Sequence, residues 1–360
     1  MNKIKFSGFL ISIVLLSACG ANAPPPTVVT NTPLPTSTSN PTNTPNPTPT
    51  PNPTSTPVPT FTVAPATKTA LPPTATPVPT KSEPRKAHAP DLVLTLAPNV
   101  EMAFVRVPAG DFLMGSADSD GDAQVVEMPQ TKVFLDEFLI GKYEVTNAQF
   151  AAFVKATGYK TSAEKNGSGY VYKGGWTEVK GADWQHPRGP ESNLQGLNDY
   201  PAVLTSWDDA VAFCAWAGRA AGGRKIKLPS EAQWEKAARG TDGISYPWGN
   251  DLQAGIDTQN VDPFSSALEI VKVGQSSPRT DSPYGAADMA GNAWEWTSSL
   301  SAPYPYKADD GREDASSRGV RVTRGGSAYL PLIVRVAGRD KSSPDYGTST
   351  LSFRVIVLPK

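Results

Sequence analysis

The chain contains three stretches in which apolar residues follow a helical spacing behind a capping residue. Helices are predicted over Asn147 to about Ala156, Trp207 to about Ala217, and Glu231 to Arg239. A Ser or Thr precedes each stretch and a polar residue follows three positions later, which is the spacing of a capping box. In the first stretch Phe150 and Phe153 fall on one face, so this helix should pack against a core.

Short apolar segments elsewhere predict strands. The candidates are Met102–Val107, Lys132–Ile140 and Phe353–Leu358, and they are separated by segments rich in turn-forming residues. Few helices, short strands and long loops favour an α+β fold over a doubly wound parallel sheet.

The first twenty residues have the pattern of an export signal. Lys3 and Lys5 form a basic start, and the apolar run from Phe9 to Leu16 is too short to cross a bilayer about 30 Å thick. The following Leu-Ser-Ala-Cys box resembles a bacterial lipoprotein signal, in which Cys19 becomes the lipidated first residue. An ordinary cleaved secretory signal is the alternative. The pattern predicts an extracytoplasmic, cell-surface or envelope lipoprotein of a bacterium, which contacts the membrane through its lipid anchor only.

Residues 20–90 have a different composition from the rest of the chain. Twenty of the 36 prolines lie here among Thr, Ser and Asn, and no charged residue occurs between Cys19 and Lys68. Such a segment buries too little apolar surface to offset its ordering entropy. We expect a disordered, extended stalk, to which His88 would also belong.

The remaining residues, 91–360, are enough for one domain with a sizeable core. The formal net charge of the chain is -1. Nucleic-acid binding requires a basic surface, so we expect no nucleic-acid partner.

Several motifs occur in order along this domain. They are Val107-Pro-Ala-Gly-Asp-Phe-Leu-Met-Gly-Ser116, Glu144-Val-Thr-Asn-Ala-Gln-Phe150, Leu228-Pro-Ser-Glu-Ala-Gln-Trp-Glu235, Gly291-Asn-Ala-Trp-Glu-Trp296 and Arg324-Gly-Gly-Ser327. Together they resemble the formylglycine-generating enzyme family, also called the sulfatase-modifying factor domain. The resemblance implies that family's variant of the C-type lectin fold.

The cysteines depart from the family pattern. The resemblance implies two cysteines after the Arg-Gly-Gly-Ser turn, which bind copper and oxidise a substrate cysteine. This chain has only Cys19 and Cys214. Cys214 has apolar neighbours and no activating base or cation beside it in the sequence, as expected of a buried, inert thiol. We therefore expect no copper and no catalytic residues.

The resemblance also implies a structural calcium site at Asp288, Gly291, Ala293 and Glu295. Carboxylates and backbone carbonyls are the ligands that a hard cation prefers. The alternative is that Glu295 hydrogen-bonds the protein itself, without a metal. A second family site would start at Asn260, where the following residues do not match. The acidic segment Asp118–Asp122 is interpreted as a solvated turn.

The end of the chain alternates family-like and divergent residues. Arg335, Arg339, Phe353 and Arg354 keep the family pattern. In the variable proteins of diversity-generating retroelements, which share this fold, the corresponding region is diversified and forms the ligand face. The resemblance therefore implies a binding face made of Ala328, Tyr329, Leu330, Leu332, Ile333, Asp340, Lys341, Ser342, Tyr346, Thr348 and Thr350. Leu332 and Ile333 could equally be core residues.

These observations favour a non-catalytic, surface-displayed lipoprotein that binds a protein or glycan ligand at its C-terminal face. Tyr and small polar residues suit such a face, because they give adaptable contacts at low entropic cost. The alternatives are a formylglycine-generating-type oxidoreductase or sulfatase-modifying factor with altered chemistry, and a purely structural envelope protein. Most tryptophans fall in family motifs and are expected in the core rather than in a sugar platform; these are Trp184, Trp207, Trp234, Trp248, Trp294 and Trp296.

Overall fold

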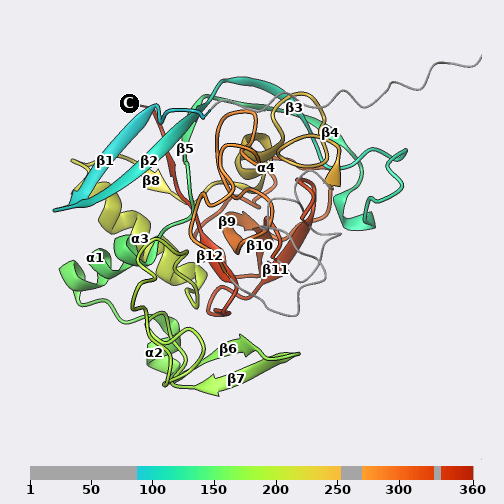
Figure 1. Cartoon of the computed structure of the whole chain (residues 1–360). Helices are drawn as coiled ribbons and strands as arrows, with labels where there is room; N and C mark the ends of the chain where they lie inside the picture. Colours follow the sequence, from blue (N-terminus) through green and yellow to red (C-terminus); the bar gives the residue numbers. More distant parts are fainter. Residues whose placement is uncertain (1–86, 253–269, 328–333, 360) are drawn as a thin grey trace, which may run out of the picture. The chain divides into compact units, whose positions relative to one another are not determined.

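The computed structural model of the chain describes residues 87–252, 270–327 and 334–359 (Figure 1). All of them belong to one unit, Pro77–Lys360. The export signal, Cys19 and almost all of the predicted stalk lie outside the described residues. None of the described helices combines the length and the apolar character that crossing a membrane requires.

Two sheets and two hairpins carry the fold. The first sheet is antiparallel and has the strand order β1-β2-β5-β13-β8, and the second has the order β11-β10-β9-β12, with β12 parallel to β9. Strands β3 and β4 pair as one separate hairpin and β6 and β7 as another. The bounds are β1 Leu92–Ala97, β2 Val100–Val107, β3 Gly110–Met114, β4 Thr131–Leu135, β5 Phe138–Gly141, β6 Ser168–Tyr172, β7 Trp176–Lys180, β8 Ile226–Lys227, β9 Trp294–Leu300, β10 Arg321–Arg324, β11 Arg339–Ser342, β12 Leu351–Phe353 and β13 Ile356–Val357.

The three predicted helices are present, each with both hydrogen bonds of a capping box. They are α1 Asn147–Thr157, α3 Trp207–Ala220 and α4 Glu231–Arg239. The Ser206 hydroxyl accepts from the Asp209 N–H at 3.1 Å, and the Ser230 hydroxyl accepts from the Gln233 N–H at 3.1 Å. A further short helix, α2 Ser162–Asn166, and a 3-10 turn, Val125–Glu127, were not predicted.

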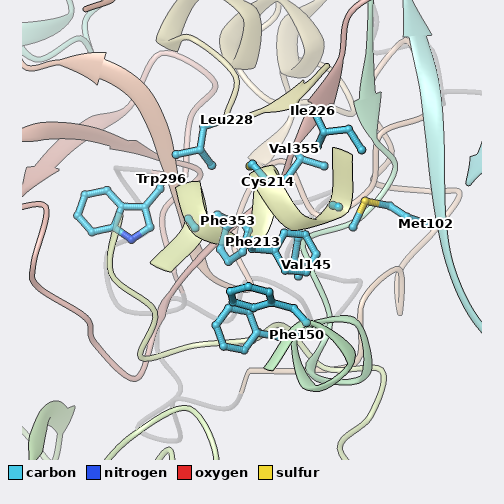
Figure 2. Packing of buried hydrophobic residues seen from close by; sticks show 14 of the residues in the cluster. Met102, Val145, Phe150, Phe213, Cys214, Ile226, Leu228, Trp296, Phe353 and Val355 are labelled. Carbon is cyan, nitrogen blue, oxygen red and sulfur yellow. The ribbon is translucent and has the colours of Figure 1, made fainter. Parts of the chain in front are cut away.

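Helices α1 and α3 pack with the strands around an aromatic core (Figure 2). The ring of Phe213 lies 6.1 Å from Phe150 and 5.4 Å from Phe353, measured between centroids. All three side chains are fully buried. Phe353 thus fixes the end of the chain to two helices, α1 and α3, that are distant from it in the sequence.

Two predicted strands are wrong as single elements. The segment Lys132–Ile140 divides into β4 and β5 at the charged pair Asp136-Glu137, where Asp136 is exposed. Phe353–Leu358 divides into β12 and β13, which belong to different sheets. The buried Arg354 lies between them and hydrogen-bonds to Glu295 in the interior. This charged residue interrupts the alternation of apolar and polar side chains that a single strand would show.

His88 is also placed differently from the prediction, because it lies against the domain. Its carbonyl accepts from the Lys142 ammonium at 2.6 Å. Gly285 (φ 85°) approaches so closely that a Cβ there would lie 2.4 Å from the His88 Cβ.

Phe353→Ala should lower the free energy of unfolding by about 3–5 kcal/mol, because it leaves a cavity between α1 and α3. Phe134, on the outer face of β4, is 61% exposed and provides the matched control. Phe134→Ala should change stability by no more than about 0.5 kcal/mol. Urea unfolding of both variants decides the point; equal losses would contradict this packing.

Candidate functional site

The Arg-Gly-Gly-Ser turn closes tightly against helix α4. Gly325 and Gly326 have φ values of 95° and 73°, a conformation that favours glycine. A Cβ on Gly325 would lie 3.3 Å from the Trp234 ring. The two glycines therefore let the chain turn directly over α4.

Arg324, at the start of this turn, is the hub of a buried charge network. Its guanidinium pairs with Glu235 of α4 and lies over the Trp234 ring, 5.3 Å from the centroid. It also donates to the carbonyls of Ala337 (2.7 Å) and Gly338 (2.6 Å). One side chain thus connects α4, β10 and the segment that leads into β11.

Two further arginines extend the network. Arg339 binds the Glu231 carboxylate through two bonds of 2.7 and 2.9 Å and stacks on Tyr304. Arg335 pairs with Glu127 at 2.9 Å and with Asp120. The segment Asp118–Asp122 is turn structure with Asp118 and Asp122 exposed, as predicted, and Arg335 pairs with its Asp120.

The structure describes six of the eleven predicted ligand-face residues, and these six differ in exposure. Ala328, Tyr329, Leu330, Leu332 and Ile333 lie outside the described residues. Asp340, Lys341 and Ser342 lie on β11, an edge strand of the second sheet, where Asp340 and Lys341 are exposed. Tyr346 is half-buried.

The prediction that Thr348 and Thr350 belong to an exposed face is wrong, because their side chains are buried, at 6% and 4% exposed. Backbone pairing explains their burial. The Leu204 N–H donates to the Thr348 carbonyl at 2.9 Å, and the Trp294 N–H donates to the Thr350 carbonyl at 2.8 Å. These bonds hold the segment inside the domain rather than on its surface.

Thr350 nevertheless borders a cleft of about 670 Å³. Most of its wall is apolar, and the charged residues among its described lining are Lys173 and Arg188. Residues Tyr172, Lys173 and Gly174 come from the tip of the β6–β7 hairpin, and Ser349 and Thr350 come from the C-terminal segment. A cleft of this volume is in the range that accommodates a small ligand or a peptide side chain.

A second pocket, of about 340 Å³, is lined by Tyr346. The Tyr346 ring lies 4.6 Å from the Tyr170 ring of β6. The Tyr170 N–H donates to the Gly347 carbonyl at 3.4 Å, and the Ser349 N–H donates to the Tyr170 carbonyl at 2.9 Å. Residues 346–350 thus pair with β6 and contribute to both hollows.

The β6–β7 hairpin was not predicted, although its sequence has the pattern of one. Alternation of Gly169 and Val171 with Tyr170 and Tyr172, followed by a Gly-Gly turn, is the pattern of a hairpin strand. Gly169 and Val171 are buried, whereas the tyrosines are half-buried.

The residues predicted to bind calcium lie in a buried acidic region. The Asp288 carboxylate accepts from the Gly274 N–H at 2.5 Å. Both oxygens of Glu295 are bound by Arg354 at 2.6 Å, and one also accepts from the Trp234 indole at 2.8 Å. Glu295 therefore bonds to the protein, as in the metal-free alternative.

Burial controls the ionisation of this region. Desolvation, followed by the charge of Asp288, raises the pKa of Glu144 well above its usual range. Desolvation also raises the pKa of Asp288 to about 6. Glu144, Asp288 and Glu295 face one guanidinium, that of Arg354, so an added cation would relieve their repulsion. Among the described residues, no three His, Cys, Asp or Glu side chains gather as metal ligands, so backbone carbonyls would have to supply part of the shell.

Comparison with known proteins agrees with this architecture. Residues 93–358 match the sulfatase-modifying factor enzyme 1-like domain. The formylglycine-generating enzyme of Bos taurus is 34% identical over 307 residues, which cover 75% of this chain and 78% of that protein. The chain belongs to the sulfatase-modifying factor enzyme 1-like family. The expected fold, the formylglycine-generating-enzyme variant of the C-type lectin fold, is thereby confirmed.

Two further comparisons are with a relative that is named as inactive and with a solved structure. The inactive C-alpha-formylglycine-generating enzyme 2 of Bos taurus is 32% identical over 283 residues, covering 70% of this chain and 86% of that protein. The structure of Treponema denticola variable protein 1 superimposes with a TM-score of 0.55 and 22% identity, over 74% of this chain and 99% of that one. The second likeness shows a common fold.

Within this sulfatase-modifying factor domain the one cysteine, Cys214, is on α3. It is 4% exposed and packs in the aromatic core (Figure 2). Desolvation raises the pKa of its thiol far above the usual value. A thiol in this state supplies almost no thiolate, the form that attacks substrates and binds metals.

Proposed function

We propose that this domain is a non-catalytic, ligand-binding member of its family. The observation that carries the proposal is the cysteine content: the domain has only Cys214, and that thiol is buried on α3. Copper-dependent oxidation needs soft thiolate ligands on the metal. The relative named as inactive supports the proposal, because a protein of similar sequence carries a name that denies the activity.

The binding role rests on the C-terminal segment. Arg324 precedes the predicted face and Arg335 and Arg339 lie within it, and each is held by buried carboxylates or carbonyls. Between these anchors and Phe353, residues 346–350 contribute to two pockets, of about 340 and 670 Å³. Pocket-lining side chains between fixed points of a rigid scaffold are a suitable arrangement for recognition, and the Treponema variable protein shares this fold.

The proposal includes display of the domain at a bacterial surface. It rests on the lipoprotein-like box ending at Cys19 and on the proline- and threonine-rich residues 20–90. An extended stalk between a lipid anchor and the domain would hold the pockets away from the membrane.

We further propose a structural calcium ion at Asp288, with the carbonyls of Gly291 and Ala293. The excess of carboxylate over guanidinium around Arg354 supports it. In this proposal Glu295 is not a calcium ligand, and its carboxylate holds the Arg354 side chain beside the site.

The protein should form no aldehyde on a cysteine-containing sulfatase-type peptide, with copper or without it, because it lacks the thiol pair. Mass spectrometry of the peptide measures the product. The Bos taurus formylglycine-generating enzyme serves as the positive control. Aldehyde above the metal-free background would favour the alternative of an oxidoreductase with altered chemistry, and its loss in Cys214→Ser would locate that activity.

Calcium should stabilise the protein, since a ligand that binds only the folded state at about 100 times its Kd adds about 2.7 kcal/mol. Thermal melts with calcium and with chelator measure the difference. Asp288→Asn should abolish most of it, whereas Asp340→Asn, an exposed acid on β11, should keep it. Melting that is the same with calcium and chelator would rule out the calcium site.

A further inference from the structure

The domain contains a hollow of about 440 Å³ that is lined by α3, β8 and the loop between β9 and β10. It shares no described lining residue with the two pockets beside residues 346–350. Most of its wall is apolar, and Cys214, Ile226 and Leu228 at its base belong to the buried core (Figure 2). Apolar surface that stays open to water in this way is a candidate binding site.

Helix α3 supplies the open side of the hollow. Val211 is 38% exposed and Ala215, one turn later, is also exposed; both line the hollow. Residues four positions apart lie on one face of a helix, so the exposed Arg219 follows them on the same face. The face of α3 that borders the hollow therefore changes from apolar to basic toward the C-terminal end of the helix.

Strand β8 brings further basic residues to that end. A Cβ on Gly218 would lie 2.6 Å from the Arg224 carbonyl oxygen, so the chain turns back tightly from α3 into β8. Lys225 and Lys227 are exposed on either side of the buried Ile226, which places both on one face of the strand. Lys227 lines the hollow at the edge of the first sheet.

The positive charge at this end has no acidic counterpart nearby in the sequence. Four of the nine residues 219–227 are Arg or Lys, and no Asp or Glu occurs between Asp209 and Glu231. Within the part of the chain that the structure describes, none of these four basic side chains forms an ion pair. A cluster of one sign beside a hollow attracts a group of the opposite charge.

The other end of the hollow disfavours an anion. The buried Arg321 stacks on Trp207, the first residue of α3, and donates to the Ala315 carbonyl at 3.4 Å, so the loop lies beside the start of the helix. Glu313 of this loop is the one acid in the described lining, and its carboxylate accepts from the Tyr306 hydroxyl at 2.9 Å. An anionic ligand should therefore place its charge at the α3–β8 end and its apolar part along α3.

We propose that this hollow binds a single-chain fatty acid, whose apolar chain lies along α3 and whose carboxylate lies beside Lys227. Burial of the chain against an apolar wall is favourable, and a carboxylate accepts charge-assisted hydrogen bonds from lysine and arginine. A peptide fits less well, because it brings backbone N–H and C=O groups against a wall with few hydrogen-bond partners for them. The site is independent of the ligand face proposed above.

The test is isothermal titration of the full chain, in buffer without detergent, with dodecanoate below its critical micelle concentration. Binding should saturate. Octanoate should bind at least about tenfold more weakly, because each methylene that leaves water adds to the affinity. Dodecyltrimethylammonium has the same chain and the opposite charge, and it should also bind at least about tenfold more weakly. Phosphatidylglycerol vesicles should compete poorly; binding to the vesicles but not to dodecanoate would show that a membrane surface is recognised instead.

Variants locate the site. Ala215→Glu should weaken dodecanoate at least about tenfold, because it puts a negative charge into the apolar wall. Ala156→Glu, the same change at an exposed alanine of α1, should leave the affinity unchanged. Lys227→Gln should weaken dodecanoate several-fold without weakening dodecyltrimethylammonium, and Lys341→Gln on β11 should do neither. Thermal melts check folding, and Val211→Glu takes the place of Ala215→Glu if that variant does not fold.

No saturation with dodecanoate, equal affinity for octanoate or for the cationic amphiphile, or an equal loss in Ala156→Glu would overturn the inference. None of these outcomes bears on the non-catalytic proposal, which the aldehyde measurement decides separately.

Discussion

The buried pairing of Arg324 with Glu235 is the interaction on which the C-terminal half of the domain depends. Neither side chain is accessible to solvent. A buried charge is very unfavourable unless it is paired and hydrogen-bonded. Arg324 meets this demand only if α4, the Arg-Gly-Gly-Ser turn and the carbonyls of residues 337 and 338 are all in place. Because the buried charge of Arg324 must be compensated, the pair fixes the positions of α4, the turn and residues 337–338 relative to one another.

Neighbouring pairs extend the same constraint. Arg339 to Glu231 ties the start of β11 to the first turn of α4, and Arg354 to Glu295 ties the end of the chain to β9. These charges fix both ends of the segment, and buried residues within it, such as Thr348, Thr350 and Phe353, belong to the interior. Residues between them that remain partly exposed, such as Tyr346 and Ser349, are available to line pockets. This explains how Tyr346 and Ser349 can contribute to binding pockets in a segment that also contains the core residue Phe353.

The sequence predicted the elements whose signals are local. The helices that begin at Asn147, Trp207 and Glu231 were predictable because a capping box is defined by residues three positions apart. The division of Lys132–Ile140 into two strands was not, because it depends on which sheet each half joins. The burial of Thr348 and Thr350 likewise results from pairing with Leu204 and Trp294, residues that are distant in the sequence.

The candidate site was predictable only in part, for the same reason. The absence of the cysteine pair can be read directly from the sequence, and so can Tyr346 as a divergent residue. The ring partner of Tyr346 could not be inferred, because Tyr170 comes from a hairpin that pairs with residues 346–350 only in the folded domain. The hydrogen bonds between Glu295 and Arg354 could not be inferred either, because these residues are distant in the sequence. The predicted role of Glu295 as a metal ligand therefore came from the family resemblance alone.

A double-mutant cycle on Arg324→Met and Glu235→Leu tests this account most directly, with free energies of unfolding from urea denaturation. Each single change should cost about 3–5 kcal/mol, because it removes one partner of a buried ion pair. The double variant should lose clearly less than the sum of the two, since the Arg324–Glu235 pair is lost only once. Arg239, which also pairs with Glu235, loses that partner equally in Glu235→Leu and in the double variant. Strictly additive losses would show that the two side chains do not depend on each other, and would contradict a C-terminal segment fixed by this pair.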